Sequence, residues 1–409
     1  MLYGNYNNLK LQGIKMFDKI ENSALKRRVK NHVIGREHDF FAVVQPGFEK
    51  RTAWELSGLN LSVKNEFIEG GVEFTGKLDS CYMASLMSRT AGRIMMRIAS
   101  FRSVNYFELE RLIRSFPWEL YISSSTRIVY RISAEKSMIY HTGKLEEIFS
   151  FGINERLAGH GILDDDAVYT QTILIRNSHD LCTVSLDASG EFLYKRGAGK
   201  KINRAPLRET SAALILLEAG INGYDQIVDP MCGSGTFSLE AASILTKTPP
   251  AFEREFPFMH WPCFKESAFR FLKNSLAKEI ISAEEVKQII ITSDIDSESI
   301  NIAKSNIPEQ FSSMVRPEAA DFFSLSGDIT KDKRTLIVLN PPYGKRLEDG
   351  SEESIYREIG VKIRTDFSTC GYAIIVPGYE KENVLGLKYD RKIPFMNGGI
   401  KAAVLFKDA

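Results

Sequence analysis

The chain has 409 residues, more than one typical domain holds, so two or three domains are expected. Its 44% hydrophobic and 26% charged residues are the proportions of a globular protein, and the absence of any apolar run of about 18 residues argues against a membrane span. The net charge of +1 does not by itself predict nucleic-acid binding, although basic residues are in surplus before about residue 205 and acidic residues after it.

Cysteine and histidine usage bears on the cell compartment and on metals. The five cysteines are scattered without CxxC spacing, and the six histidines show no ligand spacing. The N-terminus also lacks the apolar core of a signal peptide. We therefore expect a cytoplasmic protein in a reducing environment, without a structural metal and without a membrane partner.

The chain begins with an extension, residues 1–38, which carries a basic cluster at Lys26–Lys30. This cluster fits either a solvated helix or an RNA-contacting arm. Residues 39–102 then show a regular pattern. Hydrophobic periodicity predicts strands at 40–45, 61–68, 72–74 and 93–101 and helices at 48–59 and 78–90. The resulting βαββαβ order is that of a ferredoxin-like domain.

Residues 103–195 form a second α+β module. Helical spacing covers 107–116 and 145–157, and strands are predicted at 126–134, 168–176 and 182–186. A basic, glycine-containing stretch follows and reads as a linker that can lie along RNA. Its predicted RNA contacts are Lys195, Arg196, Lys200 and Lys201.

Residues 196–409 alternate strands with helices. Strands are predicted at 226–228, 289–292, 336–339 and 372–376, and helices at 207–219, 237–245 and 298–306. Such alternation predicts an α/β fold with a doubly wound, mainly parallel sheet. Ligands of these sheets bind at the carboxyl ends of the strands.

A tight glycine-containing loop, Asp229–Thr236, connects the first of these strands to a helix. The G-x-G-x-x-G spacing of a dinucleotide loop is absent, because the third position after Gly235 is Ser238. The leading Asp229 would repel a pyrophosphate and favours a ligand with an ammonium group, such as S-adenosylmethionine. A plain strand-to-helix turn is the alternative. The predicted cofactor contacts here are Asp229, Pro230, Cys232, Gly233, Ser234, Gly235 and Thr236.

Acidic residues also end the following strands. Asp294 is predicted to bind the ribose hydroxyls of the cofactor, with Asp296 as a helix cap or supporting partner; both can instead serve only as caps. Asp321 and Phe322 are predicted to hold the adenine, through the carboxylate and through ring packing. Ordinary loop packing is the alternative for this pair.

The apolar run 336–339 leads into Asn340, Pro341, Pro342 and Tyr343. Two prolines remove two backbone donors and leave their carbonyls as acceptors beside the Asn340 amide oxygen. This four-residue segment, the tip of the predicted strand, can accept hydrogen bonds from both N–H groups of an exocyclic nucleobase amine, while Tyr343 stacks on the base. Those bonds strengthen as positive charge develops on the nitrogen, so they favour the transition state. The target base must be unstacked, and guanine and adenine both fit.

The tip carries no cysteine nucleophile, which argues against covalent pyrimidine methylation. Together these motifs resemble the THUMP-domain RNA methyltransferases, most closely the RlmL-type large-subunit ribosomal RNA (guanine-N2)-methyltransferases. The segments that carry the resemblance are Phe41–Glu49, Gly70–Phe74, Leu193–Gly197, Ala205–Thr210, Asp229–Thr236, Ser293–Asp296, Asn340–Leu347 and Phe395–Ile400.

The resemblance implies a THUMP domain at 103–195, a Rossmann-like class I methyltransferase domain at 196–409 and S-adenosylmethionine as the cofactor. It implies methylation of guanine N2 in structured RNA, most closely 23S ribosomal RNA or a pre-ribosomal particle, and adds Lys345 and Arg346 to the expected RNA contacts. A second, fused methyltransferase activity is not expected. A transfer-RNA guanine-N2 methyltransferase and a non-catalytic RNA-binding or assembly factor are the alternatives.

Overall fold

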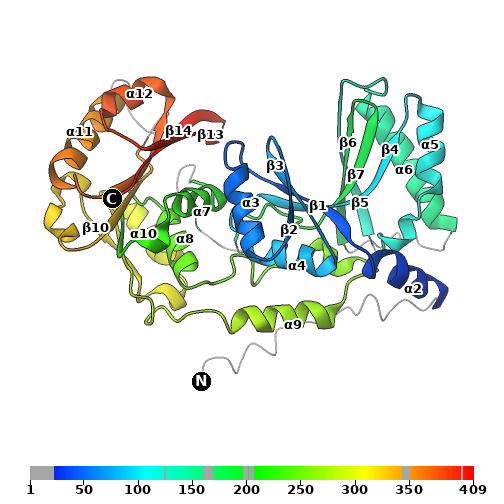
Figure 1. Cartoon of the computed structure of the whole chain (residues 1–409), viewed down its shortest axis with the longest axis horizontal. Coiled ribbons are helices and arrows are strands. Elements are labelled where there is room, and N and C mark those ends of the chain that lie inside the picture. Colours follow the sequence, from blue (N-terminus) through cyan, green and yellow to red (C-terminus); the bar gives the residue numbers. More distant parts are fainter. Residues whose placement is uncertain are drawn as a thin grey trace.

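The computed structural model describes residues 23–123, 126–159, 169–196, 201, 207–342, 351–397 and 399–409. They form two units that lie side by side (Figure 1). The front unit, residues 23–196, runs from blue to green on the right of the picture. The back unit, residues 207–409, runs from green to red. Each unit contains one seven-stranded sheet. Among the described helices, none is both long and apolar enough to cross a membrane.

The front sheet has the strand order β2-β3-β1-β4-β7-β6-β5. The predicted βαββαβ order of residues 39–102 is confirmed, and β4 continues the sheet by antiparallel pairing with β7, where Met96 lies opposite Leu186. The ferredoxin-like module and the module after it therefore share one sheet. The front elements are α2 (Ser23–Val29), η2 (Lys30–Ile34), β1 (His38–Val43), α3 (Glu49–Gly58), β2 (Ser62–Ile68), β3 (Gly71–Gly76), α4 (Leu78–Met87), β4 (Arg93–Arg102), α5 (Tyr106–Ser115), η3 (Trp118–Leu120), β5 (Thr126–Glu135), α6 (Thr142–Gly159), β6 (Tyr169–Ser178) and β7 (Leu181–Asp187).

Helices cover one face of the front sheet. On β5, Ile128, Tyr130 and Ile132 pack against the buried core that α5 and α6 contribute to, while the alternate residues are exposed. This period of two is expected for a strand with one covered and one open face. The front sheet consequently presents an open face along β5 and β6.

Part of the N-terminal extension docks on the front unit. Val29 and Val33 are fully buried in its core, and Arg28 forms an ion pair of 2.8 Å with Glu119, which also accepts two hydrogen bonds from Arg156. Burial alone would raise the pKa of Glu119, but these two guanidinium groups hold it below its ordinary value. The basic cluster of the extension is thus anchored by an apolar side and an ion pair, and is not a freely solvated helix.

The back sheet has the order β10-β9-β8-β11-β12-β14-β13, with five parallel strands and an antiparallel pair at one edge. Its elements are α7 (Glu209–Glu218), η4 (Ile221–Gly223), β8 (Gln226–Asp229), α8 (Thr236–Leu245), η5 (Pro257–His260), α9 (Glu266–Ala277), β9 (Ile289–Asp294), α10 (Ser297–Asn306), η6 (Glu309–Phe311), β10 (Val315–Ala319), η7 (Phe322–Ser324), η8 (Gly327–Thr330), β11 (Thr335–Leu339), α11 (Ser351–Asp366), β12 (Gly371–Pro377), α12 (Gly378–Leu385), β13 (Arg391–Asn397) and β14 (Ile400–Lys407).

The central strands of the back sheet are apolar on both faces because helices cover both faces. In β11, Leu336 and Val338 pack in the core formed with α7 and α8, whereas Ile337 and Leu339 pack in the core formed with α11. This confirms the predicted doubly wound α/β fold. The short strand β10 escaped prediction because Pro317 interrupts its pattern. Pro317 is tolerated there because β10 lies at the edge of the sheet.

The two units exchange core residues. Val44 and Phe48, from the loop after β1, are buried in the core of the back unit, where Phe48 meets Phe395 edge-on at 6.3 Å. In return, an excursion of the back unit between α8 and β9 packs into the front core with Phe256, Phe258 and Phe269, and α9 lies along the front unit in Figure 1. Each core is therefore completed by the other unit.

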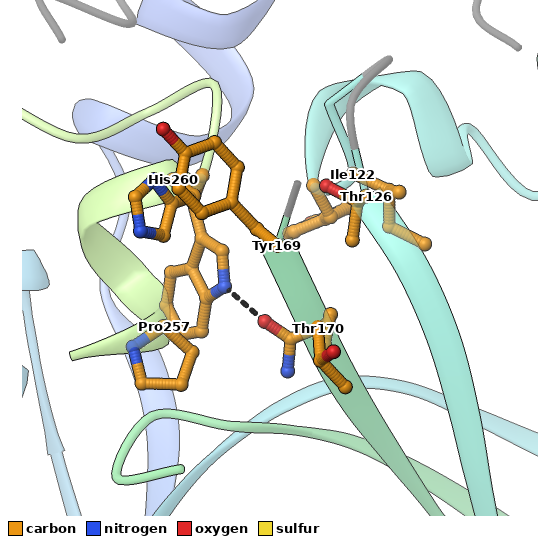
Figure 2. A pocket seen from close by; sticks show the side chains of 9 residues that line it. Ile122, Thr126, Tyr169, Thr170, Pro257 and His260 are labelled. Atoms are coloured by element: carbon orange, nitrogen blue, oxygen red, sulfur yellow. Dashed lines mark hydrogen bonds between the residues drawn. The ribbon is translucent and has the colours of Figure 1, made fainter. Parts of the chain in front are cut away.

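Polar contacts reinforce this exchange. Figure 2 shows His260 of the excursion stacked on Tyr169 at the start of β6, with ring centroids 3.4 Å apart. The indole of Trp261 donates a 2.7 Å hydrogen bond to Gln171 in the same place. The crevice between these side chains has room for about one water molecule, so it is a packing gap and not a ligand pocket.

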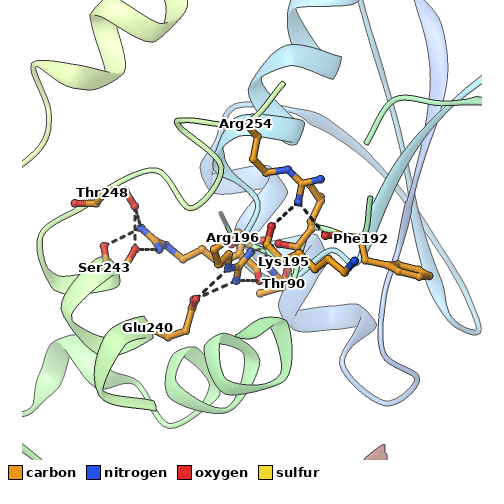
Figure 3. Close-up of polar contacts among 11 residues, drawn as sticks. Thr90, Phe192, Lys195, Arg196, Glu240, Ser243, Thr248 and Arg254 are labelled. Carbon is orange, nitrogen blue, oxygen red and sulfur yellow. Dashed lines mark hydrogen bonds and ion pairs between the residues drawn. The ribbon is translucent and has the colours of Figure 1, made fainter. Parts of the chain in front are cut away.

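A second polar junction contains three arginines (Figure 3). Arg89, which is 7% exposed, donates to the hydroxyl and carbonyl of Ser243 and to the carbonyl of Thr248. Arg196 joins Glu240 of α8 to the backbone of Arg89. Arg254 donates to four carbonyls of residues 189–195. The front unit is thereby bonded to α8.

Candidate active site

The polar residues predicted to form the site lie at one edge of the back sheet. Asp229 ends β8, Asp294 ends β9, Asn340 directly follows β11 and Asp321 follows β10. Strand β8 pairs in parallel with both β9 and β11, so the first three residues lie at adjacent carboxyl ends. The chain turns outward in both directions from β8, which makes this the switch point where doubly wound sheets bind ligands.

The loop after β8 is shaped by two glycines in left-handed conformations, with φ of +53° at Gly233 and +82° at Gly235. Most other residues adopt such angles only at a cost. A side chain at Gly233 would meet no atom within 4 Å, so this part of the loop borders open space. The loop therefore exposes its backbone to whatever occupies the edge of the sheet.

Strand β9 holds this loop in place. The amide of Cys232 donates to the Ser293 carbonyl at 3.0 Å, and the amide of Gly233 donates to the Asp294 carboxylate at 2.8 Å. The other Asp294 oxygen accepts from the Asp296 amide at 2.9 Å. Each oxygen of Asp294 keeps a free lone pair, so the carboxylate can bind a ligand hydroxyl while it positions the loop.

Asp229 is 1% exposed and bonds to Ser238 of α8 through one oxygen, while its Oδ1 is buried without a hydrogen-bond partner among the described residues. Burial raises the pKa of Asp229 to about 7; the bonds from Ser238 oppose this shift and the charge of Asp294 adds to it. A buried acceptor without a partner is costly. A ligand cation or N–H group at this edge would satisfy it.

Asn340 also has a buried polar atom without a hydrogen-bond partner. Its side-chain oxygen has none within the described part of the chain, and neither has the hydroxyl of Ser293 near the end of β9. Pro341, which follows, is buried, and Pro342 is half-buried. Buried polar groups in proteins are nearly always paired. Three such atoms, in Asp229, Ser293 and Asn340, therefore lie at neighbouring strand ends among the described residues, where a ligand can supply partners.

Two family models match the chain. The RlmL ferredoxin-like domain matches residues 39–95. The RMKL-like methyltransferase domain matches residues 196–404, slightly more than half of the chain. The chain belongs to the RMKL-like methyltransferase family. Its back unit is thus a class I methyltransferase domain, and the polar strand ends described above lie inside it.

Relatives of this methyltransferase match it along most of its length. The protein slr0064 of Synechocystis sp. is 28% identical over 90% of this chain and 95% of its own. A ribosomal RNA large subunit methyltransferase K/L of Syntrophotalea carbinolica is also 28% identical, but the chain spans only 53% of that longer protein. The crystal structure of SMU.472 with SAH has a TM-score of 0.80 at 26% identity and covers 91% of this chain and 98% of its own.

Within the methyltransferase domain, several other predicted cofactor residues have buried side chains, and their contact with the cofactor stays a prediction. Pro230, Cys232, Ser234 and Thr236 are buried in the loop and the first turn of α8. Burial raises the pKa of Cys232 far above its ordinary value, so its thiol is not a nucleophile at neutral pH. Asp296 caps α10 by accepting from the amides of Glu298 and Ser299, which confirms its alternative role as a cap.

The predicted adenine contact needs correction at Phe322. This side chain is 2% exposed and stacks on Phe367 in the core, with ring centroids 6.0 Å apart, so no face of it is open to a ligand. Asp321 caps the turn η7 through the amide of Phe323. Ile295, between Asp294 and Asp296, was not singled out from the sequence, and its side chain is 74% exposed at this edge.

The residues predicted to contact RNA differ in their exposure and in their partners. Lys195 is exposed and paired with Glu191. Arg196 needs correction, because its guanidinium binds Glu240 through two hydrogen bonds of 3.0 and 3.1 Å and is not presented to a phosphate. Lys201 is exposed, and its backbone is held by Asn306, which also donates to the Ser234 carbonyl of the cofactor loop. Tyr343, Lys345, Arg346 and Lys200 lie outside the described residues.

Metal ligation finds no support in the described part of the chain, which holds no group of three or more His, Cys, Asp or Glu side chains arranged around a common point.

Proposed function

We propose that this protein transfers the methyl group of S-adenosylmethionine to the exocyclic N2 of a guanine in large-subunit ribosomal RNA. The observation that carries the proposal is the set of unpaired buried atoms of Asp229, Ser293 and Asn340 at three adjacent strand ends of a methyltransferase domain. The K/L relatives are named as ribosomal RNA large subunit methyltransferases, and the chain spans about half of their length.

The cofactor residues follow from the chemistry of the donor set. S-adenosylmethionine supplies an electrophilic methyl group on a sulfonium. Asp229 offers its unpaired oxygen to the ammonium group, and Asp294 offers its free lone pairs to the ribose hydroxyls. Ile295 provides an apolar surface for the adenine.

The base is held by acceptors. The unpaired oxygen of Asn340 and the carbonyl of Pro341 accept the two N–H groups of the guanine amine. These hydrogen bonds become charge-assisted as the nitrogen acquires the methyl group, so they stabilise the transition state more than the ground state. The proton leaves afterwards, because the methylated ammonium is acidic. The module 103–195, which we interpret as a THUMP domain, would hold the RNA.

Labelled methyl transfer to ribosomal and transfer RNA transcripts, followed by nucleoside analysis, tests the proposal. N2-methylguanosine in the large-subunit transcript is the expected product. N6-methyladenosine without N2-methylguanosine would refute the choice of base, and labelling of transfer RNA alone would refute the choice of RNA. A calorimetric titration with S-adenosylmethionine separates these results from a protein that does not bind the cofactor.

A further inference from the structure

The open face of the front sheet carries a band of arginines. Arg97 of β4, Ser185 of β7, Leu174 of β6 and Arg131 of β5 are direct neighbours across four strands. Arg127 lies four residues before Arg131 on the same face of β5. Both β5 arginines are exposed, and the neighbouring Thr170 and Ser133 are exposed too.

Most charges on this face cancel in pairs. Arg97 binds Glu73 at 2.7 Å, Arg176 binds Glu135 at 2.7 Å, and Arg93 binds Asp187. Arg127 and Arg131 differ, because within the described residues neither has a carboxylate partner or a hydrogen bond. They are therefore a local surplus of positive charge on an otherwise balanced sheet.

Arg131 lies near a paired arginine of β4. Burial lowers the pKa of Arg93, and the charges of Arg131 and Arg254 lower it further, so each of these two arginines lies near Arg93, which is itself paired with Asp187. Arg254 is fixed there by the carbonyls of residues 189–195, including that of Phe192. The charges that a bound anion would neutralise are therefore those of Arg127 and Arg131.

We propose that Arg127 and Arg131 bind the phosphate backbone of the substrate RNA on the open face of the front sheet, away from the catalytic edge. The four-residue spacing on a strand separates the two side chains by about 13 Å. That distance suits an extended polyanion better than a single small anion. The exposed hydroxyls of Thr170 and Ser133 are donors for further phosphates. The inference rests on the proposed function, since it assigns the RNA of that reaction to this surface.

A different role for these arginines is edge protection. β5 is the last strand of the sheet, and charged side chains on edge strands prevent pairing with other chains. An acidic protein partner is the other possible occupant. The alternatives predict different results. If the arginines protect the edge, their removal should change self-association and not RNA affinity. If they bind an acidic protein, their removal should leave the affinity for a purified RNA transcript unchanged.

The test compares R127Q/R131Q with R176Q, which removes a paired arginine from the same face. Binding of a fluorescein-labelled large-subunit ribosomal RNA transcript is followed by anisotropy over a salt series. The double variant should lose affinity on the order of tenfold, and the magnitude of its log–log salt slope should fall by roughly 1.4 to 1.8. R176Q should retain both values within about twofold, since its charge is already neutralised by Glu135.

An unchanged salt slope in the double variant would overturn the proposal, as would an equal loss in R176Q. Self-association of the double variant with unchanged RNA affinity would assign the arginines to edge protection instead. Titration with S-adenosylmethionine and nucleoside analysis are run in parallel. If the salt slope falls as expected between wild type and the double variant, but wild type forms no N2-methylguanosine, the proposed function is refuted and the proposed RNA-binding surface is retained.

Discussion

Replacement of Asn340 by alanine should separate catalysis from stability. The Asn340 oxygen is buried and has no hydrogen-bond partner among the described residues, so its desolvation is not compensated there until the base binds. One charge-assisted hydrogen bond contributes about 1.5–3 kcal/mol, and tenfold in rate corresponds to about 1.4 kcal/mol. Asn340→Ala should therefore slow methyl transfer by about 10-fold to 200-fold. Its free energy of unfolding should stay level or rise by about 1 kcal/mol, because a buried unpaired acceptor is removed.

Single-turnover methyl transfer at saturating RNA measures the rate, and calorimetry measures S-adenosylmethionine affinity, which should change less than about threefold. Chemical denaturation measures stability. A variant that loses cofactor affinity together with activity would refute the role assigned to Asn340. So would a variant that transfers methyl groups at close to the wild-type rate, or one that is destabilised by more than about 2 kcal/mol.

Three further predictions, which use four substitutions, test other residues to which a role has been assigned. Asp294→Ala removes the acceptor for the Gly233 amide and should weaken S-adenosylmethionine binding at least about tenfold by calorimetry. Asp296→Ala removes a helix cap, so it should cost about 0.5–2 kcal/mol of stability and leave cofactor affinity nearly unchanged. Equal effects of the two substitutions on affinity would contradict the different roles assigned to these residues. Burial raises the pKa of Asp229 to about 7, so between about pH 4 and 7 the folded protein holds a proton that the unfolded chain has released. The free energy of unfolding should therefore fall as pH rises through that range and level off above it, and Asp229→Asn should flatten the slope in urea titrations at each pH. Arg196→Ala removes the hydrogen-bonded partner of the nearly buried Glu240, although the charge of Arg89 stays close to it. The variant should lose about 1–3 kcal/mol of stability by denaturation and keep an unchanged RNA salt slope. A reduced slope without destabilisation would restore the RNA contact first predicted at Arg196.

The sequence predicted that Asp229, Asp294 and Asn340 lie at the ends of neighbouring strands, because local rules suffice there. The runs before Asp229, Asp294 and Asn340 are apolar on both faces, which marks central parallel strands, and such strands place their polar ends together. The glycine loop was recognised for the same reason, since its positive φ angles at Gly233 and Gly235 require glycine.

Contacts between distant segments escaped prediction. Nothing near Arg196 in the sequence reveals that Glu240 lies beside it, so a basic linker was taken for an RNA contact. Phe322 reads like any aromatic after a strand, and only the packing of Phe367 shows that its ring is enclosed. The continuous front sheet depends on pairing between β4 and β7, which lie far apart in the chain.

The exchange of core residues between the units limits how the chain can be divided or recombined. A cut between residues 196 and 207 would leave Val44 and Phe48 exposed in one fragment and would remove Phe256, Phe258 and Phe269 from the core that they complete. Neither fragment would contain all the residues of its own core. A chimera that takes the front unit from a relative would therefore also have to take the excursion with α9 from that relative, so these two segments have to be exchanged together.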